Sequence, residues 1–273
     1  MKCLICSSQA KFFFSKKYDT HYREIMSSIG EVHYWKCVNC GFVLSKTHAD
    51  LDKDVWLKLN ADFHHHLEDS DNAKIVNQPP YAEQAMMLSL LSVNGLIDTS
   101  RMLDYAGGYG TLCGILQRYF QISLPIYDPF ITASKSKNYV KKEALAKYNT
   151  VINSAMFEHI LTRDDLEELN NLVSEDGVLI LHTVICENVP KDSSWFYLEP
   201  PVHTAFHTNK SMHMLMQQWG YSASLYCPQS KCWVLFKNNK NQNLQLKCAE
   251  LNDELQSVWF HYKQGFMDYW KGF

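Results

Sequence analysis

The sequence predicts an α/β fold, in which helices cover a mostly parallel sheet, preceded by a small metal-binding segment. Short apolar strands alternate with helical segments between residues 79 and 182, and this alternation is typical of parallel sheets. The glycine-rich loop 107–110 follows the first of these strands. Two CxxC pairs stand near the N-terminus, at Cys3 and Cys6 and at Cys37 and Cys40.

The composition is that of a globular protein, with 46% hydrophobic and 20% charged residues. A formal net charge of -3 gives no general attraction to nucleic acid. The chain contains no apolar run of the roughly 20 residues that a membrane-spanning helix needs, and its N-terminus lacks the apolar stretch of a signal peptide. Nine cysteines favour a reducing compartment over a disulfide framework. We therefore expect a cytoplasmic protein.

The two CxxC pairs predict a zinc site in residues 1–50. Two thiolates spaced by two residues can bind one ion, and the pairs Cys3/Cys6 and Cys37/Cys40 would complete a tetrahedral site. Four thiolates leave no position for water, so we expect a structural role for the ion. The alternative is that the four cysteines are buried apolar residues.

Residues 51–78 are polar and predict an irregular linker. The run His64, His65 and His66 lies in it. Adjacent side chains point in different directions, so these three histidines are not expected to chelate one ion, although one of them could reach the active site.

The main domain is predicted to span residues 79–240. Its expected helices are 79–95, 111–120, 162–176 and 209–220, with a short helix or turn at 141–148. Its expected strands are 101–106, 122–128, 150–160, 177–185 and the pair 221–227 and 232–237. The final segment, 241–273, predicts a C-terminal helical extension. Its aromatic residues could fill the core or join two copies into a homodimer; they are Trp259, Phe260, Tyr262, Phe266, Tyr269 and Trp270.

The glycine loop lets the backbone approach a ligand at the start of the following helix. The dinucleotide pattern G-x-G-x-x-G fails, because its third position is Cys113. The arrangement Asp104, Ala106, Gly108, Gly110 instead resembles the first motif of class I S-adenosylmethionine-dependent methyltransferases, with Ala106 in place of the first glycine. The resemblance implies a Rossmann-like seven-stranded sheet that ends in an antiparallel hairpin.

The resemblance also implies where the cofactor would bind. Asp128 follows Gly110 by 18 residues, the position of an acid that accepts hydrogen bonds from ribose hydroxyls. The segment after the third strand ends in Glu-His in this family, as Glu158 and His159 do here. The implied cofactor-binding residues are Tyr81, Asp104, Ala106, Gly107, Gly108, Gly110, Asp128, Pro129, Glu158 and His159.

Catalysis is expected from a lid formed by residues 190–208. His203 matches a histidine of the family and is the first candidate for general base, with a pKa expected near neutrality. His207 is the second candidate, and Tyr197 could orient the acceptor. The CxxC pairs resemble the zinc segment of a subgroup that methylates sugars and natural-product scaffolds, so a small-molecule acceptor is implied.

Two alternatives remain open at this point. Lys11, Lys16 and Lys17 stand beside the aromatic run 12–14 and could grip RNA, although the rest of the chain has no basic stripe. Alternatively, the substitution at Ala106 could mark a catalytically inactive partner subunit.

Overall fold

The computed structural model describes the chain apart from residues 20–21, 69–78, 132–137, 155, 238–242 and 269–273. The chain divides into two compact units, each described by itself. Unit 1 contains residues 1–78, 158–165 and 184–214, and unit 2 contains residues 79–157, 166–183 and 215–273. Among the described residues, none of the helices is long and apolar enough to cross a membrane.

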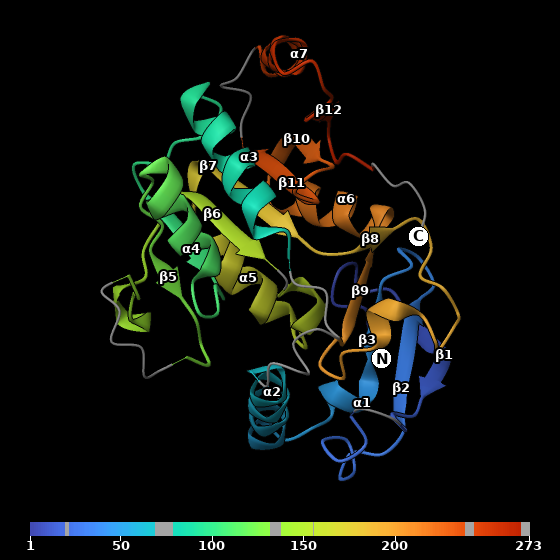
Figure 1. The fold of residues 1–273 in the computed structure, drawn as a ribbon. Helices are drawn as coiled ribbons and strands as arrows, with labels where there is room; N and C mark the ends of the chain where they lie inside the picture. Colours follow the sequence, from blue (N-terminus) through green and yellow to red (C-terminus); the bar gives the residue numbers. More distant parts are fainter. Residues whose placement is uncertain (20–21, 69–78, 132–137, 155, 238–242, 269–273) are drawn as a thin grey trace. The chain divides into compact units, whose positions relative to one another are not determined.

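Unit 1 is built on a five-stranded sheet with the order β1-β2-β3-β9-β8. The strands are β1 (Ala10–Lys16), β2 (Val32–Cys37), β3 (Val43–Ser45), β8 (Ile185–Cys186) and β9 (Ala205–Thr208). Neighbours pair antiparallel except β8 and β9, which are parallel. The sheet therefore joins strands of the cysteine-bearing segment to strands from the later part of the chain (Figure 1).

The segment predicted as an irregular linker contains a helix. After the single turn α1 (Lys46–Ala49), helix α2 spans Lys53–Glu68. The backbone of His64, His65 and His66 belongs to α2, while their side chains lie outside the described part. The sequence did not predict this helix because its composition is polar. Only a few of its described apolar side chains are buried, among them Leu59 and Phe63, so the apolar face is weak.

Unit 2 contains the predicted sheet of seven strands, in the order β12-β10-β11-β7-β6-β4-β5. Its parallel part consists of β4 (Met102–Tyr105), β5 (Ile126–Tyr127), β6 (Tyr148–Ser154) and β7 (Val173–His182). The predicted hairpin β10 (Tyr221–Cys227) and β11 (Cys232–Lys237) is also present, with β11 antiparallel to β7. The predicted α/β fold class is therefore confirmed.

Most predicted helices are present as well. Helix α3 (Tyr81–Val93) packs against α4 (Thr111–Ile115), which continues as the π-helix η1 (Leu116–Phe120) (Figure 1). The chain also forms the 3-10 turns η2 (Lys142–Ala144), η3 (Phe157–His159) and η4 (Phe196–Leu198) and the helices α5 (Arg163–Asn171) and α6 (Asn209–Gln218). Helix α5 ends earlier than predicted, because β7 begins at Val173 and its residues pair with β6.

The C-terminal segment departs from the prediction of one long helix. Helix α7 covers only Leu244–Glu254, and the chain then forms β12 (His261–Gln264), which pairs antiparallel with β10. The aromatic residues from Trp259 to Phe266 therefore follow the helix and do not lie on it, so an aromatic helix that joins two copies is not what the structure shows. Phe260 is buried in the core of unit 2, in line with the core-packing alternative. Tyr269 and Trp270 lie outside the described residues.

Candidate active site and metal centre

The glycine loop begins where the buried strand β4 ends. Three of its residues have left-handed backbone conformations, with φ of 60° at Ala106, 55° at Gly108 and 77° at Gly110. An L-residue in this region costs about 1–2 kcal/mol, and glycine adopts it freely. Ala106 therefore stands in a conformation that glycine adopts freely and alanine adopts with local strain.

The three glycines of the loop have two different environments. A Cβ at Gly107 would lie 2.6 Å from the Asp104 carboxyl, and a Cβ at Gly110 would lie 2.5 Å from Ile126 Cδ1. A Cβ at Gly108 would instead meet no heavy atom of the described residues within 4 Å. Gly107 and Gly110 thus pack the loop against the sheet, while the backbone at Gly108 faces open space.

Asp128 fixes the loop from the end of β5. Its Oδ2 accepts a hydrogen bond from the Gly108 N–H at 2.9 Å, and its Oδ1 accepts from the N–H groups of Phe130 at 2.8 Å and Ile131 at 3.1 Å. The Tyr139 hydroxyl donates to the Gly108 carbonyl at 2.7 Å. Gly108 is therefore held at both its N–H and its carbonyl. Pro129, next to Asp128, is exposed.

Asp104 lies beneath the loop and is only 2% exposed. Its Oδ1 has no hydrogen-bond partner among the described residues. Burial, and secondarily the negative charge of Asp128, raise the pKa of Asp104 to about 7. Burial and the nearby Asp104 also raise the pKa of Tyr81, at the start of α3, to about 12. Tyr81 and Asp104 therefore belong to one electrostatic environment.

Further polar atoms are buried near the carboxyl ends of β6 and β7. Asn153 Oδ1 and His182 Nδ1 have no hydrogen-bond partner within the described ranges, although Asn153 Nδ2 donates to the Tyr105 carbonyl at 2.7 Å. Burial lowers the pKa of His182 to about 4. Ligands of open α/β sheets bind outside the carboxyl ends of the strands, and unpaired buried polar atoms are rare in native proteins. The ends of β4, β6 and β7 thus have the polar groups that a ligand would satisfy.

The four cysteines of the CxxC pairs come together in unit 1. The Sγ atoms of Cys3 and Cys40 are 3.6 Å apart, those of Cys6 and Cys37 are 3.4 Å apart, and all four lie within 4.8 Å of one another. Tetrahedral Zn–S bonds of about 2.3 Å place sulfur atoms under about 4 Å apart, so the donor set fits zinc. The hydrogen bond that the Cys40 thiol makes to Cys3 lowers the pKa of Cys3 to about 5.

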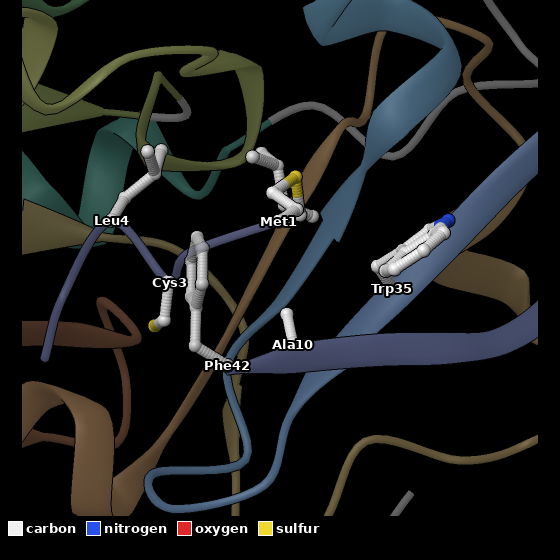
Figure 2. A pocket seen from close by; sticks show the side chains of 7 residues that line it. Met1, Cys3, Leu4, Ala10, Trp35 and Phe42 are labelled. Carbon is white, nitrogen blue, oxygen red and sulfur yellow. The ribbon is translucent and has the colours of Figure 1, made fainter. Parts of the chain in front are cut away.

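Backbone N–H groups inside the two turns contact the cysteine sulfurs. The Ile5 N–H donates to Cys3 Sγ at 3.4 Å, and the Asn39 N–H donates to Cys37 Sγ at 3.4 Å. Such N–H donors stabilise thiolates. Cys3 also lies among apolar side chains, which Figure 2 shows; they are Met1, Leu4, Ala10 and Phe42. The site is thus preformed and mostly shielded from water.

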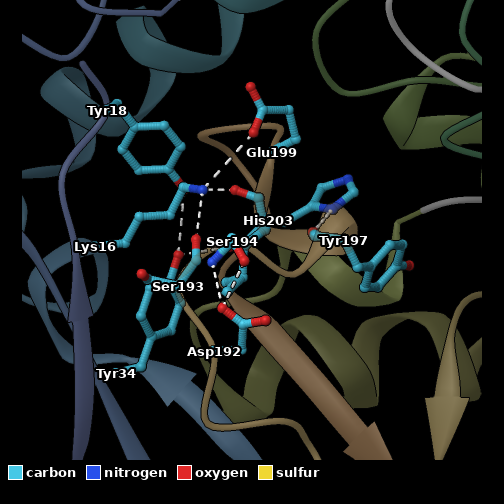
Figure 3. A network of polar contacts seen from close by, with 10 residues as sticks. Lys16, Tyr18, Tyr34, Asp192, Ser193, Ser194, Tyr197, Glu199 and His203 are labelled. Atoms are coloured by element: carbon cyan, nitrogen blue, oxygen red, sulfur yellow. Dashed lines mark hydrogen bonds and ion pairs between the residues drawn. The ribbon is translucent and has the colours of Figure 1, made fainter. Parts of the chain in front are cut away.

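A second cluster in unit 1 gathers three of the expected site residues. Glu158 and His159, in η3, offer ligand or proton-accepting atoms within 4.8 Å of those of His203. The His203 Nδ1 lies 2.7 Å from the Tyr197 carbonyl, so Nδ1 donates its proton there and Nε2 carries the lone pair (Figure 3). The ring centroids of His203 and Tyr197 are 4.6 Å apart. The structure therefore brings Glu158 and His159, expected at the cofactor, together with the expected base.

Three expectations about the lid need correction. Burial lowers the pKa of His203 to about 4 instead of leaving it near neutrality. His207 is 0% exposed in the interior of β9, where its ring lies 4.9 Å from that of Phe42; its burial in the sheet removes it as a candidate base. Residues 205–208 form the strand β9, so the expected lid is restricted to residues 190–204. The Tyr197 hydroxyl accepts a hydrogen bond from the Val184 N–H at 3.1 Å.

Tyr139 is a site residue that the sequence did not identify. The sequence places it 11 residues after Asp128 with no glycine or acid beside it. The parallel bridge between Ile126 and Tyr139 places its hydroxyl within hydrogen-bond distance of the Gly108 carbonyl. Its position as an aromatic residue shortly after the second strand was the available sequence signal for a role of Tyr139 in the site.

The glycine-loop geometry can be compared with known proteins. Residues 63–224 match the family model described as "Methyltransferase domain". The comparison with curated proteins found no match. Among solved structures, the plantazolicin methyltransferase BpumL in complex with SAH is 10% identical, with 68% of this chain and 99% of that chain covered and a TM-score of 0.43.

Two other structures are similar to this chain. A possible histamine N-methyltransferase from Thermotoga maritima is 13% identical, with 79% and 93% of the chains covered and a TM-score of 0.39. CalO1, a methyltransferase of calicheamicin biosynthesis in its SAH-bound form, is 12% identical, with 57% and 54% covered and a TM-score of 0.41. The family match covers more than half of the 273 residues, and the chain therefore belongs to the methyltransferase domain family.

Proposed function

We propose that this protein transfers a methyl group from S-adenosylmethionine to a small-molecule acceptor. One observation supports the cofactor above all: a Cβ at Gly108, in the loop that Asp128 holds after the first parallel strand, would meet no described heavy atom within 4 Å. A glycine backbone that faces open space permits close approach of a ligand.

Asp128 is proposed to bind the ribose hydroxyls. Its carboxylate accepts three backbone N–H bonds, and a carboxylate has about four acceptor sites. One acceptor site thus remains for a hydroxyl donor, while the backbone bonds keep the carboxylate oriented. Gly107, Pro129 and Tyr81 would line the same region.

Asp104 is proposed to lie near the positively charged part of the cofactor. Its unpaired Oδ1 and its raised pKa make it a group that gains from an approaching cation. Ala106 would keep the backbone of the loop close to the cofactor. Its left-handed conformation argues against the alternative of an inactive partner subunit, because the substitution leaves the conformation of the loop intact.

His203 is proposed as general base for a hydroxyl or another acidic acceptor. Its Nδ1 is engaged by the Tyr197 carbonyl, so the neutral ring presents Nε2 for the acceptor proton. With a pKa of about 4 the ring is neutral at pH 7. Glu158 and His159 would orient Nε2 or share the proton, and Tyr197 would hold the ring through its main chain.

The four cysteines are proposed to hold one structural Zn²⁺. The sulfur distances fit tetrahedral coordination, and four thiolates leave no position for a substrate. The ion would stabilise the turns at both ends of the β1–β2 segment. Together with the methyltransferase domain, this segment supports an acceptor of the sugar or natural-product class.

Isothermal titration calorimetry tests the cofactor assignment. The wild type should bind S-adenosylmethionine or S-adenosylhomocysteine in preference to NAD. Asp128→Ala should weaken binding about ten- to a hundredfold, because a charge-assisted hydrogen bond contributes about 1.5–3 kcal/mol. Asp253→Ala, which removes an exposed carboxylate on α7, is the matched control. Preference for NAD, or salt-dependent RNA binding without cofactor affinity, would contradict the proposal.

A further inference from the structure

The β1–β2 segment makes hydrogen bonds to the main chain of the lid through three side chains. Lys16 Nζ donates to the Ser193 carbonyl at 2.8 Å, the Tyr18 hydroxyl to the Leu198 carbonyl at 3.0 Å, and the Tyr34 hydroxyl to the His203 carbonyl at 3.2 Å (Figure 3). All three donors precede the second CxxC pair, and all three acceptors lie between residues 193 and 203. The contacts are therefore a series along one stretch of the lid.

The three donors are buried, which makes their partners necessary. Lys16 is 8% exposed and Tyr34 is fully buried. Burial lowers the pKa of Lys16, whose ammonium has Glu199 as its ion-pair partner at 3.7 Å. A buried polar group that loses its hydrogen-bond partner destabilises the folded protein by its full desolvation free energy. The lid carbonyls are thus held in place by donors with no solvent alternative.

Each of the two tyrosines donates its hydroxyl proton to a different carbonyl. The hydroxyl oxygens of Tyr18 and Tyr34 are 3.4 Å apart, but each hydroxyl has one proton to donate. Because Tyr18 donates to Leu198 and Tyr34 donates to His203, the contact between the tyrosines is a contact of two oxygens. Each tyrosine therefore fixes a different point of the lid.

His203 is held at three points. Its N–H donates to the Pro200 carbonyl at 3.1 Å, its Nδ1 donates to the Tyr197 carbonyl at 2.7 Å, and its own carbonyl accepts from Tyr34. The first two bonds come from the lid itself, so they would move with it. Among the hydrogen bonds of the described residues, the one to Tyr34 ties His203 directly to a sheet strand, because Tyr34 stands on β2 and pairs with Ser45 of β3.

We propose that Tyr34 is a positioning residue that sets where His203 stands, and that the cysteine-bearing segment serves catalysis in this way. The inference rests on the proposed role of His203 as base. Strand β2 ends at Cys37, so the proposed zinc site anchors the strand from which Tyr34 reaches the lid. A misplacement of about 1 Å in a catalytic group can slow a reaction on the order of 10²-fold.

The test is Tyr34→Phe, which removes one buried hydroxyl and keeps the ring. The matched control is Tyr221→Phe, which removes a buried hydroxyl that donates to Asn170 Oδ1 at 3.1 Å in unit 2. Hydrogen–deuterium exchange of residues 196–204 is measured in both full-length variants, together with kcat, KM and cofactor affinity. Lys16→Met is a second variant that loosens the lid at Ser193, for use if Tyr34→Phe does not fold.

Tyr34→Phe should speed exchange across residues 196–204 at least about tenfold and lower kcat by about ten- to a hundredfold, with cofactor affinity unchanged. Tyr221→Phe should change neither quantity. Exchange of residues 196–204 equal to wild type, or a kcat loss no larger than that of the control, would overturn the inference. Exchange is measured without substrate, so it still reports on the positioning contact if the wild type proves to have no methyltransferase activity.

Discussion

Asp104 should make the stability of this protein depend on pH in a way that one substitution abolishes. Its pKa is about 7 in the folded protein, against 3.8 for an exposed aspartate. A group whose pKa is raised on folding contributes stability that is complete below the unfolded pKa and is lost as the pH rises through the folded pKa. The window for Asp104 therefore runs from about pH 4 to about pH 7.

The magnitude follows from the two pKa values. A difference of about three pH units corresponds to about 4 kcal/mol at 1.36 kcal/mol per unit. Between pH 5 and pH 8 the wild type should lose about 3 kcal/mol of its free energy of unfolding through this one carboxyl group. The side chain of the Asp104→Asn variant cannot ionise, so this variant should not lose that stability as the pH rises. The amide occupies about the same volume beside Gly107 as the carboxyl group does.

Urea denaturation at pH 5, 6, 7 and 8 measures the effect. All other titrating groups are common to both proteins, so the difference in unfolding free energy between variant and wild type isolates Asp104. That difference should shift in favour of the variant by about 3 kcal/mol from pH 5 to pH 8. The same variant should bind S-adenosylmethionine more weakly at pH 8. A difference that stays constant with pH would refute the claim that a buried, unpaired carboxyl lies under the loop.

Three further predictions concern the other sites. Cys37→Ser should lower bound zinc from about one equivalent per chain and reduce thermal stability. The control Cys248→Ser, at a buried cysteine of unit 2, should leave the zinc content unchanged. Unchanged zinc in Cys37→Ser would contradict the proposed metal site. Ala106→Gly should change the free energy of unfolding by less than about 1 kcal/mol, because relief of left-handed strain offsets the added freedom of the unfolded chain. Ala106→Val should destabilise the protein. Equal urea midpoints for the two variants would contradict the left-handed conformation at residue 106. His203→Gln should lower kcat by about 10²- to 10⁴-fold and abolish a limb of the pH–rate profile near pH 4, above which the neutral imidazole accepts the proton; a limb that survives assigns the proton transfer to another group.

Much of the fold could be predicted because local patterns and tertiary packing agree. The turn between β10 and β11 was predicted at residues 228–231, and the strands end at Cys227 and begin at Cys232. A helix was predicted to begin at residue 162, and the Thr162 Oγ1 accepts a hydrogen bond from the Asp165 N–H at 3.2 Å at the start of α5. Where patterns and packing disagree, prediction fails. Residues 261–264 alternate too weakly to predict a strand, and only the free edge of β10 gives them partners.

For the candidate site, too, prediction succeeded where a local requirement decides the residue type and failed where tertiary packing decides. Residues whose role depends on backbone conformation, such as Gly108 and Gly110, could be predicted because few residue types tolerate a positive φ. The electrostatics could not be predicted, because a pKa depends on burial, and burial depends on which distant segments pack together. His203 shows this most clearly. The sequence predicted a pKa near neutrality for His203 in a lid, whereas the Tyr34 hydroxyl and the Tyr197 carbonyl contact it from β2 and η4. Enclosure lowers its pKa and at the same time fixes which nitrogen holds the proton. A buried imidazole with a pKa of about 4 is a weaker base than an exposed one but is already in its neutral, reactive form at pH 6. The kcat at saturating cofactor should therefore be nearly flat between pH 6 and pH 8.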